Sequence, residues 1–212
     1  MSTIKVTGYA KEFVTADVIK YQITVYGDGQ TSSKALDSVK TNTEKVLSIL
    51  VKMGITPDNV RLDKDHVYRQ QSYNGKEQLI CVERDISFKM PFNAGFSSSL
   101  LEKLKESKVE VRLNTDFYYS KEREIQQEIF KKAVINSREI ADAIAEASGQ
   151  SITGIESVLD DKYNDRYAGD DKPLYGQING IWLDEGETSI ADKIKAKELT
   201  FEERVHASWN VE

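Results

Sequence analysis

The longest helical pattern in the chain runs from Ser120 to Gly149, and it constrains the fold more than any other stretch. Ser120 is the predicted N-cap and Gly149 the predicted C-terminal stop. Because a helix with one apolar face is not stable alone, the chain must supply a sheet or further helices to cover that face. Apolar and small residues recur at three- and four-residue spacing on one half of this helix: Ile125, Ile129, Phe130, Ala133, Ser137, Ile140, Ala141, Ile144 and Ser148.

Alternation with a period of two predicts strands on both sides of this helix. In Val18–Tyr26, for example, Ile19, Tyr21 and Ile23 alternate with polar residues, so one face is buried and the other is wet. The predicted strands are Ile4–Val14, Val18–Tyr26, Val60–Gln71, Gln78–Met90, Val109–Tyr119, Ser151–Leu159 and Phe201–Val211.

Two shorter helices are predicted between these strands. The first is Ser32–Met53, capped by Ser32 or Ser33 and stopped by Gly54. The second lies within Phe92–Ser107. The residues predicted to face inward are Leu36, Val39, Thr43, Val46, Leu47 and Leu50 on the first helix, and Phe96, Leu100 and Leu104 on the second.

The connections predict which strands are neighbours. The short stretch Thr15–Asp17 favours a hairpin between the first two strands, and Asn74-Gly75 favours a hairpin between the third and fourth. We expect Ser151–Leu159 to pair antiparallel with Phe201–Val211, and the long helix to lie beside its flanking strands Val109–Tyr119 and Ser151–Leu159.

The predicted order is ββαββαβαββ. Adjacent hairpins imply mainly antiparallel sheet with the amphipathic helices packed on one face, which is an α+β fold. We predict a single domain over residues 1–212, with a polar, acidic excursion at about 160–200 between the last two strands. That excursion holds ten acidic and six basic residues, a net charge of −4 (6 − 10), and a loop of this length is either mobile or a binding element.

Charge and hydropathy exclude several classes of function. The net charge of −6 argues against non-specific binding to nucleic acid or to an anionic membrane, since both need a surplus of Lys and Arg. No apolar run approaches the ~20 residues of a membrane-spanning helix. The stretch from Met1 to Val6 lacks the pattern of a signal peptide, so the chain as printed reads as cytoplasmic; a chain from which a leader had been removed would be periplasmic.

The sequence assigns no catalytic, cofactor-binding or metal-binding residue. In the strand pattern Asp63 and Asp65 share one face and His66 points to the other, while His206 is predicted on the wet face of the last strand. Cys81 is predicted to be a small packed side chain. The acidic residues after position 159 leave a calcium site open as an alternative, but their spacing does not fit an EF-hand loop.

Two features indicate protein partners. Ile135 projects from the charged half of the long helix and is a candidate subunit contact, against the alternative of an ordinary exposed isoleucine. Aromatic residues in the acidic excursion either anchor a partner or ligand, or pack the loop onto the sheet: Tyr163, Tyr167, Tyr175 and Trp182.

The order of elements and several local signatures resemble the SIMPL-domain family of bacterial proteins. Ile4 to Ala10 resembles the family's opening strand with V-T-G-x-G/A, and Leu50 to Val60 resembles its L-x-x-x-G-I-x-x-x-D-I. Ala133 to Gly149 resembles A-x-x-x-A-R-x-x-A-x-x-L-A-x-x-x-G, and Ala207 to Val211 fits the closing strand. The resemblance spans about residues 4–159 and 201–211.

This resemblance implies a protein of unassigned cellular role. Family members are commonly exported or membrane-associated, some are linked to stress tolerance, and one resembles a ring- or channel-like homo-oligomer. The family has no agreed catalytic residues, so none is carried over. The leading hypothesis is a non-enzymatic protein that acts through self-association or protein binding. The alternative is a small-ligand or metal-binding protein, or a hydrolase, with a site between the sheet and the 160–200 loop.

Overall fold

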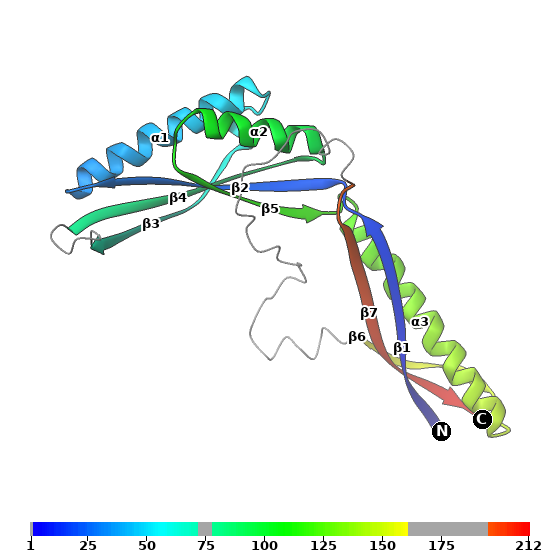
Figure 1. Cartoon of the computed structure of the whole chain (residues 1–212). Coiled ribbons are helices and arrows are strands. Elements are labelled where there is room, and N and C mark those ends of the chain that lie inside the picture. The colour runs from blue at the N-terminus through cyan, green and yellow to red at the C-terminus, as the bar shows by residue number, and fades with distance from the viewer. Residues whose placement is uncertain (1, 72–77, 161–194) are drawn as a thin grey trace. The chain divides into compact units, whose positions relative to one another are not determined.

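The computed structural model describes residues 2–71, 78–160 and 195–212. Its elements follow the predicted order, with one short 3₁₀ helix added, and two antiparallel sheets with three α-helices confirm the α+β fold (Figure 1). The elements are β1 (Ser2–Thr15), β2 (Val18–Gly29), α1 (Ser32–Lys52), η1 (Pro57–Asn59), β3 (Arg61–Gln71), β4 (Gln78–Pro91), α2 (Ala94–Glu106), β5 (Val111–Tyr118), α3 (Glu122–Ala147), β6 (Ile152–Asp160) and β7 (Glu198–Val211).

Two compact units divide these elements. Unit 1 contains β1, α3, β6 and β7, and unit 2 contains β2 to β5 with α1 and α2. The prediction of one domain over residues 1–212 stays a prediction. The last strand, β7, is longer than predicted. It begins at Glu198 and therefore includes three residues of the predicted excursion.

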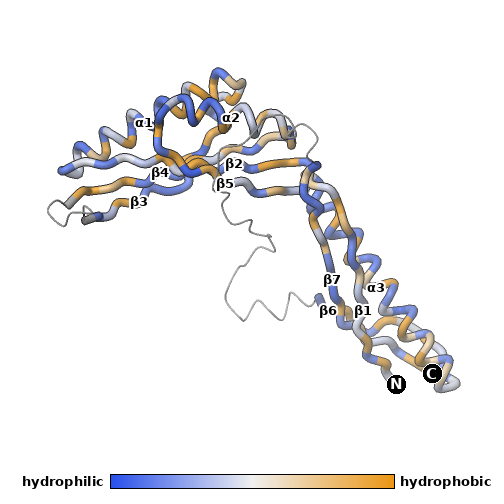
Figure 2. Tube along the Cα trace, viewed as in Figure 1, coloured by the Kyte–Doolittle hydropathy of each residue, from blue (hydrophilic) through white to orange (hydrophobic). Residues whose placement is uncertain are grey.

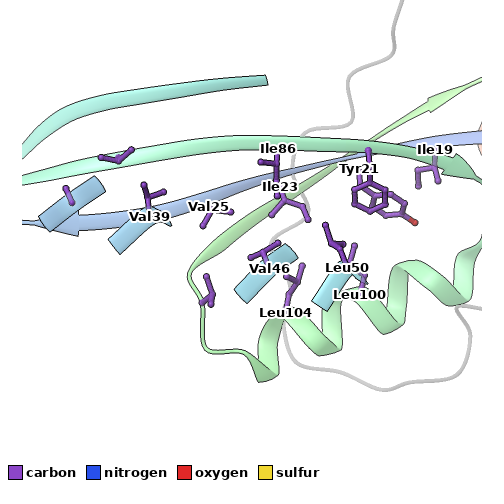
Figure 3. Packing of buried hydrophobic residues seen from close by; sticks show 14 residues of the cluster. Ile19, Tyr21, Ile23, Val25, Val39, Val46, Leu50, Ile86, Leu100 and Leu104 are labelled. Atoms are coloured by element: carbon purple, nitrogen blue, oxygen red, sulfur yellow. The ribbon is translucent and has the colours of Figure 1, made fainter. Parts of the chain in front are cut away.

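Unit 2 is a four-stranded sheet in the order β3-β4-β2-β5 with α1 and α2 on one face. The predicted pairing of the third and fourth strands is confirmed, while Asn74-Gly75 lies outside the described residues. Figure 3 shows the core between sheet and helices, where Tyr21 lies among side chains from both layers. The Tyr21 ring stacks on Phe88 at 5.0 Å between centroids, and its hydroxyl lies 2.5 Å from Ser97 Oγ.

The N-cap of α1 differs from the predicted one. Thr31, rather than Ser32 or Ser33, is the N-cap, and its hydroxyl accepts the Lys34 N–H at 3.3 Å. Gly54 ends α1 in the left-handed region (φ +91°), as predicted. Leu36 was predicted to face inward but is 46% exposed, because its neighbour Ala35 occupies the buried row.

The inward residues of α2 are as predicted. Leu100 and Leu104 are buried, and Phe96 lies 5.5 Å from the Tyr21 ring. The Asn93 side chain caps this helix by accepting the Phe96 N–H at 3.1 Å.

Unit 1 is a three-stranded antiparallel sheet in the order β1-β7-β6, with α3 on one face. The predicted pairing of the last two strands is confirmed. The predicted hairpin between the first two strands is wrong: β1 pairs with β7 from Ser2 to Thr15, and β2 pairs with β4 and β5. A three-residue connection allows a hairpin, but β1 instead pairs with β7 over its whole length, and its alternate residues from Ile4 to Val14 are buried or half-buried.

The long helix packs on β1 and β7, with a smaller contact to β6. The expectation that Val109–Tyr119 lies beside it is wrong, because β5 pairs with β2 in the other sheet. Ser120 is not its cap, since the N-cap is Lys121, which makes no side-chain capping bond. Gly149, with φ +72°, ends the helix as predicted.

The buried row of α3 consists of one isoleucine and four small residues: Ile129, Ala133, Ser137, Ala141 and Ala145. Figure 2 shows hydrophobic and hydrophilic residues interleaved along the rest of this helix. Ile140 and Ile144 were predicted to be on the covered half, but they are 37% and 44% exposed. Gly8 of β1 explains the difference, because a Cβ there would lie 2.0 Å from the Ala133 carbonyl oxygen. The strand approaches so closely that only the row of small residues fits beneath the helix.

Candidate functional site

The exposed side of α3 carries apolar side chains on two separate faces. Ile135 is 59% exposed and lies on the face turned away from the sheet, beside the Arg138–Asp142 ion pair of 2.9 Å. Ile140 and Ile144 lie on a flank of the helix, next to the buried row. The structure therefore places the predicted contact residue Ile135 in solvent and reveals a second apolar surface that the sequence analysis had assigned to the core.

Polar contacts show which flank of α3 faces the edge of the sheet. The Asn136 side-chain oxygen accepts the backbone N–H of Tyr9 at 3.1 Å, and Lys132, one turn earlier, forms an ion pair with Glu12. β1 is an edge strand, because β7 is its partner on one side and none of the described strands pairs with the other. Asn136 therefore bonds an N–H that points out of the sheet edge.

A row of uncharged residues continues this flank toward the end of α3. Its residues are Ile140, Ala143, Ile144 and Ala147, all exposed, at positions 4, 7, 8 and 11 after Asn136. Helical periodicity places these positions in one row with Asn136. Lys132 pairs with Glu12 and Asn136 bonds Tyr9, so α3 runs antiparallel to β1, and the residues after Asn136 lie at the level of the β1 residues that precede Tyr9. We call these four residues the α3 ledge.

The face of the unit 1 sheet away from α3 is polar around Thr7 and His206, with Phe13 and Leu159 exposed on the same face. Thr7 Oγ1 lies 3.0 Å from His206 Nδ1, and the two residues are direct neighbours across β1 and β7. A depression of ≈ 400 Å³ lies over this pair, lined also by Lys5 and Ser157. A hydroxyl–imidazole contact is one part of a nucleophilic site, but here it is the hydrogen bond expected of cross-strand neighbours on a wet face. The predicted exposure of His206 is confirmed.

The corresponding face of the unit 2 sheet holds a network of tyrosine and carboxylate groups. The Tyr68 hydroxyl donates to Glu83 at 3.2 Å, and desolvation together with this bond raises the pKa of Tyr68 to about 12. The buried Thr24 hydroxyl donates to Asp85 at 2.6 Å and lies 3.4 Å from the Arg112 guanidinium. These groups satisfy one another, which is the arrangement of a stable polar surface and not of a free general base.

A β-bulge changes the predicted faces of β3. The register of β3 against β4 shifts between Leu62 and Lys64, so Asp63 and Asp65 lie on opposite faces, and the prediction that they share one is wrong. Asp63 pairs with Lys20 at 3.4 Å on the polar face. Asp65 instead receives two hydrogen bonds from Arg84, at 2.8 and 2.7 Å, which lower the pKa of its carboxyl group. The alternation within β3 does not show the bulge, because the register shift is visible only in the pairing of β3 with β4.

A second depression, of ≈ 440 Å³, lies on the polar face of unit 2 between Lys20, Arg61, Lys89 and the two carboxylates of Asp58 and Asp63. The Lys89 ammonium group lies 4.2 Å above the Tyr118 ring. Cations and anions in this depression are close to balanced, so it offers no strong field to a ligand of either charge.

The described residues give no metal centre, since no group of three or more His, Cys, Asp or Glu side chains is placed to hold an ion. Cys81 is buried, as predicted, and burial raises the pKa of its thiol. Within the same ranges no helix is long and apolar enough to cross a membrane. The predicted partner contacts Tyr163, Tyr167, Tyr175 and Trp182, and most of the 160–200 excursion, lie outside the described residues.

Sequence reasoning predicted neither the edge position of β1 nor the α3 ledge, although the sequence contains a signal for the ledge. Small residues at every fourth position of α3, from Ala133 to Ala145, mark the line of closest approach to the sheet. The larger apolar residues beside that line therefore lie on its flank and are left outside the core.

Comparison with known proteins gives a family and no activity. The profile of the SIMPL family, described as a protein of unknown function (DUF541), matches residues 4–209. No curated protein matches.

Two solved structures have a distant likeness to the chain. A protein described as an aminohydrolase, from methicillin-resistant Staphylococcus aureus, is 13% identical with a TM-score of 0.24, over 64% of this chain and 38% of that one. A hydrolase from Listeria innocua is 11% identical with a TM-score of 0.20, over 96% of this chain and 92% of that one. At these scores neither likeness bears on fold or activity. The family match spans both units, from the Val6–Ala10 signature to β7, and the chain therefore belongs to the SIMPL family.

Proposed function

We propose that this SIMPL-family protein acts without catalysis, through self-association or binding to another protein. The observation that carries the proposal is the apolar surface of α3, where Ile135, Ile140 and Ile144 are each more than a third exposed. Scattered apolar side chains are normal on a protein surface, but Ile140 and Ile144 lie one turn apart on the same flank of the helix, and Ile135 projects from its other face. Burying them against another polypeptide removes apolar area from water at about 25 cal/mol per Å².

Sedimentation velocity over a wide range of protein concentration, together with affinity capture from cell extract, tests this proposal. We expect a reversible oligomer or a stoichiometric partner. A chain that stays monomeric at every concentration and captures no partner would refute it.

Replacing Ile135 with Lys and, separately, Ile144 with Lys asks which face of α3 takes part. Both side chains are exposed, so neither variant is expected to lose the fold, and unchanged far-UV circular dichroism is the control. The thermal stability of the full-length wild-type chain, measured with panels of metal ions and metabolites, tests the alternative of a ligand-binding protein. A rise in Tm of several degrees with one ligand class would favour that alternative through linkage.

A further inference from the structure

In the part of the chain that the structure describes, the outer edge of β1 lacks the prolines and bulges that commonly protect an edge strand, and Lys5 is its one charged residue before Tyr9. Over 14 residues it contains no proline, and its register against β7 runs from Ser2 to Thr15 without a bulge. Natural sheets commonly protect a free edge with such interruptions or with inward-pointing charges, because free N–H and C=O groups recruit further strands. Only one charged residue, Lys5, lies among the residues before Tyr9.

The hydrogen bond between Asn136 and Tyr9 shows which backbone groups point outward. In an antiparallel strand N–H and C=O groups of alternate residues point to the same side. Because the Tyr9 N–H points away from β7, those of Thr3, Lys5 and Thr7 do so too. Asn136 accepts the outward N–H of Tyr9, whereas no described residue accepts the outward N–H groups of Thr3, Lys5 and Thr7. The α3 ledge follows Asn136 along the helix and therefore lies at the level of the same segment.

We propose that this edge and the α3 ledge form the contact between two copies of the chain, in which β1 pairs antiparallel with its own counterpart around a two-fold axis at Val6. This inference rests on the proposed self-association and names its surface. Lys5 of each copy then lies opposite Thr7 of the other, and the two three-stranded sheets become one continuous sheet. The two-fold axis places both ledges on the same side, where Ile140 and Ile144 of one copy meet their counterparts.

A second copy fits this surface because the surface is complementary to itself. An antiparallel strand edge offers donors and acceptors in the same alternation as its own symmetry mate. The four ledge residues themselves carry no charge, so their own side chains meet without like-charge contact although the chain as a whole has a net charge of −6. An axis at Lys5 would instead place two lysines opposite each other, which is why the register centred on Val6 is favoured.

A proline at position 5 tests the strand contact in the full-length chain. Lys5→Pro removes an outward N–H that the β1–β7 ladder does not use, and proline is tolerated at such edge positions. Two symmetry-related hydrogen bonds are lost at once, so we expect the dimer dissociation constant from sedimentation equilibrium to rise at least about tenfold. Lys5→Ala is the matched control, because it loses the same side chain but keeps the N–H, and it should leave the constant within about threefold.

A second pair of variants tests the ledge independently of the strand. Ile144→Lys places two ammonium groups in the helix contact and should also raise the dissociation constant at least about tenfold. Ile135→Lys, on the face of α3 turned away from the sheet, should not change it. All four variants should keep the far-UV circular dichroism spectrum of the wild type.

The outcomes separate this inference from the proposed function. A wild-type dimer that Ile135→Lys weakens, and that Lys5→Pro and Ile144→Lys leave intact, overturns the inference and keeps self-association. A wild-type chain that is monomeric but captures another protein also overturns the inference of a contact between two copies, and it keeps the proposal of protein binding. A wild-type chain that is monomeric and captures nothing refutes the proposed function itself.

Discussion

Replacing Gly8 with Ala is the sharpest test of how β1 and α3 fit together. A Cβ at this position would lie 2.0 Å from the Ala133 carbonyl oxygen, 2.7 Å from Ser137 Cβ and 2.8 Å from the Ser137 backbone nitrogen. Two of these three atoms belong to the backbone of the helix, so no side-chain rotation can relieve the clash. The strand and the helix must separate, and the packing of the whole buried row is disturbed.

The expected cost follows from that geometry. Adding atoms to a packed core costs about 1–3 kcal/mol when side chains can adjust, and here the backbone must move, so we expect about 3 kcal/mol or more for unit 1. With a urea m-value of about 1–3 kcal/mol per molar, the midpoint of unfolding should fall by at least about 1 M. Backbone strain plays no part, because Gly8 does not have a positive φ.

Trp209 provides the signal for this measurement. It is buried in unit 1 and is one of two tryptophans in the chain, so a Trp182→Phe background makes fluorescence report on this unit alone. Gly154→Ala is the matched control in the same sheet, since a Cβ there meets nothing within 4 Å, and it should change the free energy of unfolding by no more than about 0.5 kcal/mol. Equal midpoints for Gly8→Ala and wild type would show that β1 and α3 are not in close contact.

Three further predictions concern ionisable groups in unit 2. Asp65→Asn should lower stability at pH 7 by up to about 1 kcal/mol, since the pair with Arg84 is partly exposed. Because Arg84 lowers the pKa of Asp65 in the folded state, its stabilisation is present above the unfolded pKa of about 3.9 and is lost as pH falls below it, so urea midpoints of variant and wild type should converge in acid. In a spectrophotometric titration Tyr68 should ionise at about 12, and Glu83→Gln should lower that value; an ordinary pKa near 10 in the wild type would contradict the partly buried contact with Glu83. The Cys81 thiol should react slowly with a thiol reagent in the folded chain and rapidly in urea, and equal rates would show that it is not buried.

Most of the local structure could be predicted from the sequence because it depends on neighbours along the chain. The period-two pattern of Val18–Tyr26 and the i, i+4 pattern after Ser120 place β2 and α3 within a few residues of their observed ends. Gly54 and Gly149 end their helices because the left-handed backbone conformation favours glycine, whatever the rest of the fold does. The family resemblance, over about residues 4–159 and 201–211, rests on the same local signals and agrees with the family match.

The tertiary structure decided which elements meet. A short connection after β1 is compatible with a hairpin, but β1 pairs with β7 at the other end of the chain, and no local signal reports a contact between residues so distant in sequence. The same holds for Ile140 and Ile144, whose spacing fits a covered face but which lie outside it because Gly8 brings the strand against the alanine row. The long amphipathic pattern of α3 thus determined that the helix must cover a sheet. Only the close approach of that sheet decided which apolar residues are buried and which are left to form the ledge.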